Sequence, residues 1–239
     1  MFAPLSVILS DIDPKQHIEK TVLCTKMAII LSNSLGLSNV RDAFISLLSK
    51  GMQFVGHNEL KLKNVLCIKA LIDVAMEKQS DLGSGWKFIF ECMSKLENLF
   101  NIKSGHSDKE IFGISSKEEA MDNKIFELLS SRIDPAYIDM VYLKSVNIDD
   151  DKIEEFIFNL CQAAHSEIEH REDPRIFCLQ KIVEVADINL SRPRTIWSRM
   201  WKHISLVLIK VSNNTNKQMI IYAIDSLKQL TTKLLTVIS

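Results

Sequence analysis

Apolar residues recur with helical spacing through two adjoining segments, and this periodicity constrains the fold more than any other feature of the chain. Asp173 is a plausible N-cap for the first segment and Pro174 a plausible first helical residue, where the missing N–H of proline costs nothing. The first apolar stripe then follows the i, i+3, i+4, i+7 pattern at Leu179, Ile182, Val183 and Ala186. Ser191 and Pro193 open the second segment, whose stripe comprises Trp197, Met200, Trp201, Ile204, Leu208 and Val211. Two such stripes joined by a short loop predict a helical hairpin.

An earlier segment, Cys67–Leu96, repeats this pattern and aligns with the hairpin without a gap. Ala75 matches Ala186, and in each copy a tryptophan follows eleven residues later. A third, partial copy at Ile220–Leu235 has the pattern of the first helix of another unit. Helical hairpins that repeat and stack are typical of HEAT and armadillo proteins. We therefore predict an all-α fold, a HEAT/armadillo-like α-solenoid of about eleven helices.

The composition is consistent with a single helical-repeat domain over residues 1–239. Hydrophobic residues make up 46% of the chain, enough to bury a continuous core, and only 7 Gly and 5 Pro are present. The 29 Lys and Arg nearly balance the 30 Asp and Glu, and this total gives no basic face of the kind that nucleic-acid binding requires. The polar stretch at residues 103–117 predicts a flexible insertion between repeat units.

Five scattered cysteines without a C-x-x-C pair indicate free, buried thiols in a reducing compartment. The first residues lack the basic region of a signal peptide. No apolar run approaches the ~18 residues that a membrane span needs. These observations predict a cytoplasmic protein without a transmembrane segment.

Individual helices can be placed from their periodicity. A helix over residues 16–34 is expected to present Leu23, Met27, Ile30 and Leu31 on one apolar side, with Gly36 ending it. Asp149–Asp151 is expected to cap a helix over residues 152–169, because acidic residues favour a helix N-terminus. A final helix is expected over residues 217–238.

The sequence offers no catalytic constellation. It contains no glycine-rich phosphate loop, no nucleophile elbow and no zinc-ligand spacing, so we expect no catalytic residue, cofactor or metal. His165 and Glu169 stand at i, i+4 and could form half of a metal site, but a solvated helix end is the favoured interpretation.

The most distinctive surface candidate is an aromatic and basic cluster near the second segment of the hairpin. In one interpretation its tryptophans belong to the core and its arginines shield the stripe or cap helix ends. In the other the cluster binds a protein partner or an anionic lipid surface. The candidate partner-binding residues are Lys63, Asn64, Arg192, Arg194, Arg199 and Lys202.

Four stretches carry a resemblance to a known family. They are RDAFISLLSKGMQF from Arg41, LKNVLCIKALIDVAMEKQSDLGSGWKFIFECMSKLENL from Leu62, DPRIFCLQKIVEVADINLSRPRTIWSRMWKHI from Asp173 and IYAIDSLKQLTTKLL from Ile221. Together they resemble the first homology region downstream of the catalytic exchange domain in the large brefeldin A-inhibited guanine-nucleotide exchange factors for Arf GTPases. The F-R-x-P-G-E-A-type motif of that exchange domain is absent from these 239 residues.

The resemblance implies a non-catalytic regulatory region, acting in membrane recruitment, in sensing of GTP-bound Arf and in control of the exchange domain. It also implies peripheral contact with an anionic membrane and a place on the cytosolic face of the trans-Golgi network. The alternative hypothesis is a generic HEAT-like scaffold that binds another small GTPase or associates with itself as a homodimer. An enzyme is the least favoured hypothesis.

Overall fold

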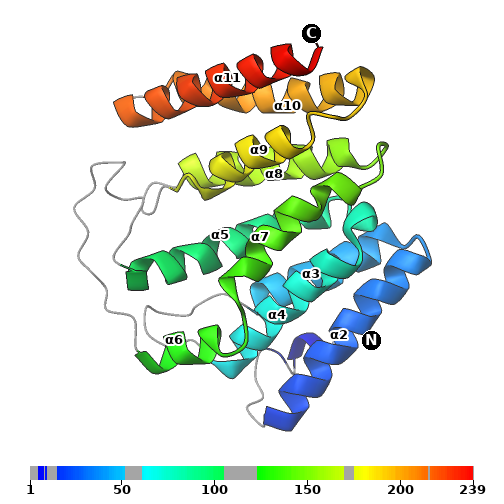
Figure 1. Ribbon diagram of the computed structural model, residues 1–239. Coiled ribbons are helices and arrows are strands. Elements are labelled where there is room, and N and C mark those ends of the chain that lie inside the picture. Colours follow the sequence, from blue (N-terminus) through cyan, green and yellow to red (C-terminus); the bar gives the residue numbers. More distant parts are fainter. Residues whose placement is uncertain are drawn as a thin grey trace. The chain divides into compact units, whose positions relative to one another are not determined.

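The computed structural model describes residues 5–7, 9, 15–51, 61–104, 123–169, 175–214 and 216–238. Within these residues the regular structure is helical and no strand is formed (Figure 1). The elements are α2 (Lys15–Ser34), α3 (Ser38–Lys50), α4 (Leu62–Glu77), η1 (Gln79–Asp81), α5 (Gly85–Ser104), α6 (Asn123–Ser130), α7 (Pro135–Leu143), η3 (Lys144–Asn147), α8 (Ile153–Glu169), α9 (Phe177–Ile188), α10 (Arg194–Ser212) and α11 (Lys217–Ile238). These elements confirm the predicted all-α, solenoid-like fold class.

The contacts within the chain divide it into two compact units, and the division falls after Val141 near the end of α7. Among the described residues, the first unit holds α2 to α6 and most of α7, and the second holds η3 and α8 to α11. A single regulatory domain over residues 1–239 stays a prediction. Of the insertion expected at residues 103–117, the first two residues end α5 and the rest lies outside the described residues.

In the first unit, α2 packs on α3 and α4, and the side of α2 that is buried differs from the predicted one. Leu23, Met27 and Leu31 are exposed, and Ile30 is half-buried. The buried line contains three polar residues among its apolar ones: Ile18, Thr21, Val22, Thr25, Ile29 and Ser32. The threonines tolerate burial because each hydroxyl donates to a carbonyl one turn earlier, at 2.7 Å for Thr21 and 2.8 Å for Thr25. The prediction from apolar spacing was therefore wrong for this helix.

The predicted end of α2 is confirmed. Gly36 has a φ of 68°, a left-handed conformation that glycine adopts without steric cost. The N–H of Leu37 donates to the carbonyl of Ser32 at 2.8 Å, and the N–H of Gly36 donates to the carbonyl of Asn33 at 3.0 Å. These two bonds close the helix as a Schellman motif, and α3 begins two residues later.

In the second unit, the helices form two antiparallel pairs, α8 with α9 and α10 with α11 (Figure 1). The pairs stack through α8 on α10 and through α9 on α11. The predicted hairpin of α9 and α10 is therefore wrong as a pairing, although both apolar stripes are buried except for Val183 and Trp201, which are half-buried. Periodicity identifies the face that a helix buries but not the helix that covers it, and here α8 and α11 cover both.

The start of α9 also differs from the prediction. The helix begins at Phe177, while Asp173 and Pro174 lie outside the described residues. Its first turn is capped from another helix, because Oε2 of the buried Glu167 on α8 accepts a hydrogen bond from the N–H of Cys178 at 2.8 Å. The positive end of the helix dipole also stabilises a carboxylate at this position.

The two repeated segments share a buried tryptophan with an aromatic neighbour. Trp86 near the start of α5 and Trp197 near the start of α10 are both buried. Each pairs with an aromatic residue one turn later: Trp86 stacks on Phe90 with ring centroids 5.1 Å apart, and Trp197 meets Trp201 edge-on at 5.6 Å. The sequence repeat thus corresponds to a repeated aromatic contact.

None of the five cysteines is paired in a disulfide, and they are not uniformly buried. Cys24 is exposed, whereas Cys67, Cys92, Cys161 and Cys178 are buried. Burial raises the pKa of the Cys161 thiol to about 12. It raises that of Cys67 to about 12 as well, although nearby Lys63 acts in the opposite direction. Within the described residues, no helix combines the length and apolarity that a membrane span requires.

Candidate functional site

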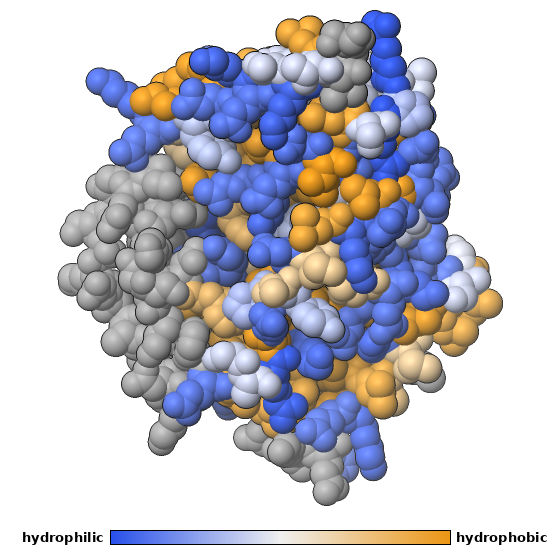
Figure 2. Space-filling view, in the orientation of Figure 1, coloured by the Kyte–Doolittle hydropathy of each residue, from blue (hydrophilic) through white to orange (hydrophobic). Residues whose placement is uncertain are grey.

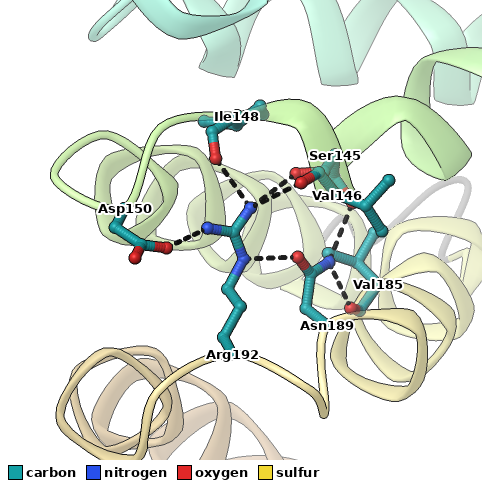
Figure 3. A network of polar contacts seen from close by, with 7 residues as sticks. All are labelled: Ser145, Val146, Ile148, Asp150, Val185, Asn189 and Arg192. Carbon is teal, nitrogen blue, oxygen red and sulfur yellow. Dashed lines mark hydrogen bonds and ion pairs between the residues drawn. The ribbon is translucent and has the colours of Figure 1, made fainter.

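Arg192 lies in the short connection between α9 and α10, and its side chain is only 9% exposed. Its Nε donates to Oδ1 of Asn189 at 2.7 Å, and its Nη1 forms an ion pair with the carboxylate of Asp150. Its Nη2 donates to three backbone carbonyls, of Ser145 at 3.0 Å, Val146 at 3.2 Å and Ile148 at 2.7 Å (Figure 3). The guanidinium is thus surrounded by acceptors from the same unit.

Asn189 extends this network. Its Nδ2 donates to Oγ of Ser145 at 2.9 Å and to the carbonyl of Val185 at 2.8 Å. The network, which we call the Arg192 staple, joins the segment before α8 to the segment after α9 (Figure 3). Because the donors of Arg192 are used inside the unit, the geometry favours a structural role over the partner-binding role predicted from the sequence.

The first unit has a similar contact that the sequence analysis did not identify. Arg41 on α3 is buried, and its Nη1 donates to the carbonyl of Asp81 in η1 at 2.6 Å. Its Nε donates to Oδ1 of Asp42 at 2.7 Å. In each unit an arginine therefore bridges a helix pair: Arg41 joins the start of α3 to η1 after α4, and Arg192 joins the connection after α9 to the segment before α8.

Arg199 lies on the edge of α10 that faces α8. Its Nη1 lies 3.7 Å from Oε2 of Glu154, and Nε2 of His203 lies 3.3 Å from Oε1 of the same carboxylate. Exposed ion pairs of this kind contribute little to stability. The side chain of Arg199 is 49% exposed. Because its ion pair with Glu154 is weak, the guanidinium remains accessible to a partner.

His165 and Glu169, considered as half of a metal site, instead form an ion-pair cluster with Lys210. Nδ1 of His165 lies 2.9 Å from Oε2 of Glu169, and Nζ of Lys210 donates to Oε1 at 2.8 Å. The hydrogen bond from Lys210 lowers the pKa of the Glu169 carboxyl. An ammonium group at this carboxylate disfavours a metal cation, and no group of three or more potential ligands occurs among the described residues.

Arg194 and Lys202 differ from Arg192 because both are exposed on α10. Neither forms an ion pair with any residue in the described part of the chain. Their charges therefore face solvent without internal compensation. Of the predicted candidates, these two fit a partner-binding role best.

The remaining two candidates, Lys63 and Asn64, belong to the first unit. Asn64 is buried at the start of α4, where its Oδ1 accepts from the N–H of Lys61 at 2.7 Å and its Nδ2 donates to the carbonyl of Gly51 at 2.6 Å. Nζ of Lys63 donates to the carbonyl of Leu9 at 3.2 Å. Asn64 therefore caps a helix and ties it to the end of α3, which favours a structural role.

The balanced total charge conceals a basic last helix pair, which the sequence analysis missed. The only acidic residue on α10 and α11 is Asp225. Against it stand seven basic residues: Arg194, Arg199, Lys202, Lys210, Lys217, Lys228 and Lys233. Counting charge over residues 194–233, rather than over the whole chain, would have found this concentration.

A cavity of about 240 Å³ lies in the first unit between α4 and the turn that follows α6. Tyr137, Arg132 and the ion pair of Lys69 with Asp73, 3.6 Å apart, contribute to its lining. Its lining contains no histidine or cysteine. Ser130 and Ser131 also line it, and the hydroxyl of Ser131 donates to the carbonyl of Leu128 at 3.0 Å.

Comparison with known proteins identifies relatives over nearly the whole chain. Brefeldin A-inhibited guanine nucleotide-exchange protein 1 of Arabidopsis thaliana is 27% identical over 282 residues, which cover 98% of this chain and 17% of the relative. The protein of the same name in Homo sapiens is 29% identical over 265 residues, covering 98% of this chain and 14% of the relative. ADP-ribosylation factor guanine nucleotide-exchange factor sec72 of Schizosaccharomyces pombe is 24% identical over 264 residues, which cover 95% of this chain and 14% of the relative. No family model matches the chain.

These relatives confirm the resemblance predicted from the sequence. The chain spans only 14–17% of the length of the relatives described above, and it is therefore similar to one region of these large exchange factors.

Proposed function

We propose that this chain is a non-catalytic regulatory region of a large Arf guanine-nucleotide exchange factor, and that it senses GTP-bound Arf through α10. The observation that supports this function is the match over 98% of the chain to a region that is only 14–17% of its relatives. The exposed and unpaired cations Arg194 and Lys202 supply the contact. In this proposal the region also contributes to recruitment to anionic Golgi membranes and to control of the linked exchange domain.

A binding experiment with Arf tests the sensing role. The full chain is immobilised, and Arf carrying GDP or a non-hydrolysable GTP analogue is passed over it, with and without anionic vesicles. We expect at least about tenfold tighter binding of the GTP form, equivalent to about 1.4 kcal/mol. Equal binding of the two forms under both conditions would refute Arf sensing.

Charge reversal locates the contact. The double substitution Arg194→Glu and Lys202→Glu is expected to weaken Arf binding about fivefold or more without changing the melting temperature, because both side chains are exposed and unpaired. Lys20→Glu with Arg132→Glu makes the same change of charge on exposed side chains of the first unit and serves as the control. Equal weakening by both pairs would indicate a general charge effect and would contradict a contact on α10.

Nucleotide exchange on Arf provides an independent measurement. The chain alone is expected to leave the spontaneous rate unchanged, and acceleration would contradict the non-catalytic assignment. Added to a purified exchange domain, the chain is expected to alter the exchange rate, and an unchanged rate would refute control of that domain.

A further inference from the structure

The cavity of the first unit, which we call the Arg132 cavity, combines buried apolar residues with an exposed polar rim. Ile72 of α4 and Ile133 of the turn after α6 line it and are almost completely buried, at 2% and 3% exposure. The rim holds the exposed side chains of Lys69, Arg132 and Tyr137. Over α7, which crosses the middle of the view in Figure 2, hydrophobic side chains also lie among hydrophilic ones. A ligand that fills this cavity therefore needs both a polar and an apolar part.

One of the two carboxylates in the lining, that of Asp73, is already neutralised by lysines. Its Oδ1 lies 3.6 Å from Nζ of Lys69, and its Oδ2 lies 3.6 Å from Nζ of Lys26. Nζ of Lys26 also donates to Oε1 of Glu77 at 2.6 Å, so that these two lysines and two carboxylates balance one another. Asp73 therefore offers a ligand no uncompensated negative charge.

Arg132 differs from the other charged residues of the lining. Oδ1 of Asp134 accepts a hydrogen bond from the N–H of Ala136 at 2.9 Å, at the start of α7, where the helix dipole stabilises a negative charge. The guanidinium of Arg132, by contrast, forms no hydrogen bond or ion pair with any residue in the described part of the chain, and the same is true of the hydroxyl of Tyr137. The cavity thus presents one uncompensated positive charge and a second hydrogen-bond donor.

We propose that the Arg132 cavity binds the carboxylate of a compact monoanionic ligand, whose apolar part packs on Ile72 and Ile133. A guanidinium forms two parallel hydrogen bonds to a carboxylate, and a phenol hydroxyl donates a third. One uncompensated cation matches a monoanion better than a phosphoryl group, which carries nearly two charges at neutral pH. The volume of about 240 Å³ equals that of about eight water molecules. The ligand is therefore a small organic acid or the carboxylate end of a peptide.

The same lining disfavours cationic and neutral ligands. An ammonium group would compete with Lys69 and Lys26 for Asp73, and it would share the cavity with the guanidinium of Arg132. A neutral apolar ligand would displace water from that guanidinium without replacing its hydrogen bonds. Charge is therefore the property of the ligand that a test must vary.

Three fluorinated ligands of similar size test this selectivity on the full chain. The first, 4-fluorobenzoate, carries a carboxylate, whereas 4-fluorobenzamide is neutral and 4-fluorobenzylamine is a cation at neutral pH. Titration followed by fluorine NMR is expected to show saturable binding of 4-fluorobenzoate with a dissociation constant of about 1 mM, as is typical of so small a ligand. The amide and the amine are expected to bind at least about tenfold more weakly.

Substitutions locate the binding at Arg132. Arg132→Gln is expected to weaken binding of 4-fluorobenzoate at least about tenfold, whereas Arg132→Lys keeps the charge without the paired geometry and should weaken it about threefold. Tyr137→Phe keeps the ring, and the loss of its hydroxyl should also cost about threefold. Arg194→Gln makes the same change at an exposed arginine of the second unit and should alter binding less than about twofold. Similar melting temperatures for all variants establish that they are folded.

A peptide pair distinguishes the two sources of the carboxylate. A tripeptide that is acetylated at its N-terminus and ends in phenylalanine is prepared with a free C-terminal carboxylate and as its amide. Displacement of 4-fluorobenzoate by the free acid, but not by the amide, would support a chain end as the ligand. Binding of 4-fluorobenzoate that neither peptide displaces would support a small organic acid.

Several results would overturn the proposal. One is the absence of saturation by 4-fluorobenzoate up to about 20 mM. Another is equal or tighter binding of the amide or the amine, and a third is unchanged binding to the Arg132→Gln variant. Displacement of 4-fluorobenzoate by less inorganic phosphate than acetate would indicate a general anion site and would also contradict it. None of these measurements involves Arf, so their outcome is independent of the proposed function.

Discussion

Replacing Arg192 by methionine is the most direct test of the Arg192 staple. Methionine keeps much of the length of the side chain but removes all of its donors. The substitution leaves acceptors without their hydrogen-bond partner: Oδ1 of Asn189, the carboxylate of Asp150 and the carbonyls of Ser145, Val146 and Ile148. Because the guanidinium is only 9% exposed, water cannot replace it without local rearrangement.

The magnitude follows from the nature of these contacts. A hydrogen bond from a charged donor contributes about 1.5 to 3 kcal/mol, but the contributions do not add, because loop carbonyls near the surface can recover water. The carboxylate of Asp150 is 51% exposed, and its ion pair contributes little by itself. We therefore expect Arg192→Met to lower the free energy of unfolding by about 3 kcal/mol, the upper end of what one hydrogen bond from a charged donor contributes. For a chain of this size, that loss lowers the melting temperature by about 6 to 12 °C.

Urea unfolding monitored by circular dichroism, together with thermal melting, measures this effect. Arg192→Lys retains the charge but cannot reach as many acceptors at once, so about half of the loss is expected. Arg194→Met is the matched control, because it removes an exposed arginine two residues away and should cost less than about 0.5 kcal/mol. A loss below about 1 kcal/mol for Arg192→Met, or equal losses for Arg192→Met and Arg194→Met, would refute the structural role of the staple.

Three further predictions concern the core. Trp197→Ala is expected to lower the free energy of unfolding by about 3 to 5 kcal/mol, because the side chain is buried against Trp201, whereas Tyr137→Ala at an exposed position should cost less than about 0.5 kcal/mol in the same urea titration. A colorimetric thiol reagent at pH 8 should label Cys24 in the folded chain and the other thiols only after unfolding; rapid labelling of more than one thiol would contradict their burial. The free energy of unfolding should also fall as the pH rises from about 9 toward 12. Thiols in the unfolded chain ionise near pH 9.0, whereas those of Cys67 and Cys161 in the folded chain keep their protons to about pH 12. The folded state therefore binds more protons than the unfolded state in this interval, and raising the pH favours unfolding. Thermal melts against pH should show a shallower decline for Cys161→Ala, and an unchanged slope would refute this cause.

The sequence predicted the fold class and the position of the long helices because strong periodicity depends on local spacing. The final helix, expected over residues 217–238, has those bounds in the structure. The predictions were wrong where contacts between helices determine which side of a helix is buried or where a helix begins. The buried side of α2 includes Thr21 and Thr25, whose hydroxyls are satisfied within the helix, so counting apolar residues selected the exposed side instead. The start of α9 depends on Glu167 from another helix, a contact that no local capping pattern reveals.

The candidate partner-binding residues stay a prediction, and the structure separates them by their surroundings. Arg192 and Arg194 are the same residue type two positions apart, yet one is enclosed by carbonyls and the other is exposed. Residue type alone does not distinguish them. Asp149–Asp151 was interpreted as a capping run, which stays a prediction, and the ion pair of Asp150 with Arg192 was not predicted. The excess of basic residues on α10 and α11 could have been found in the sequence, but the net charge of the whole chain does not show it.

The cap that Glu167 provides makes the first turn of α9 depend on α8. An isolated peptide spanning α9 would start with its first amide groups unsatisfied, and nucleation of so short a helix is costly. When α9 packs on α8, the carboxyl group of Glu167 accepts a hydrogen bond from the N–H of Cys178, which offsets part of the cost of forming the first turn of α9. Chain growth from the N-terminus makes α8 first, so the carboxyl group of Glu167 is present before the α9 amide group that it caps.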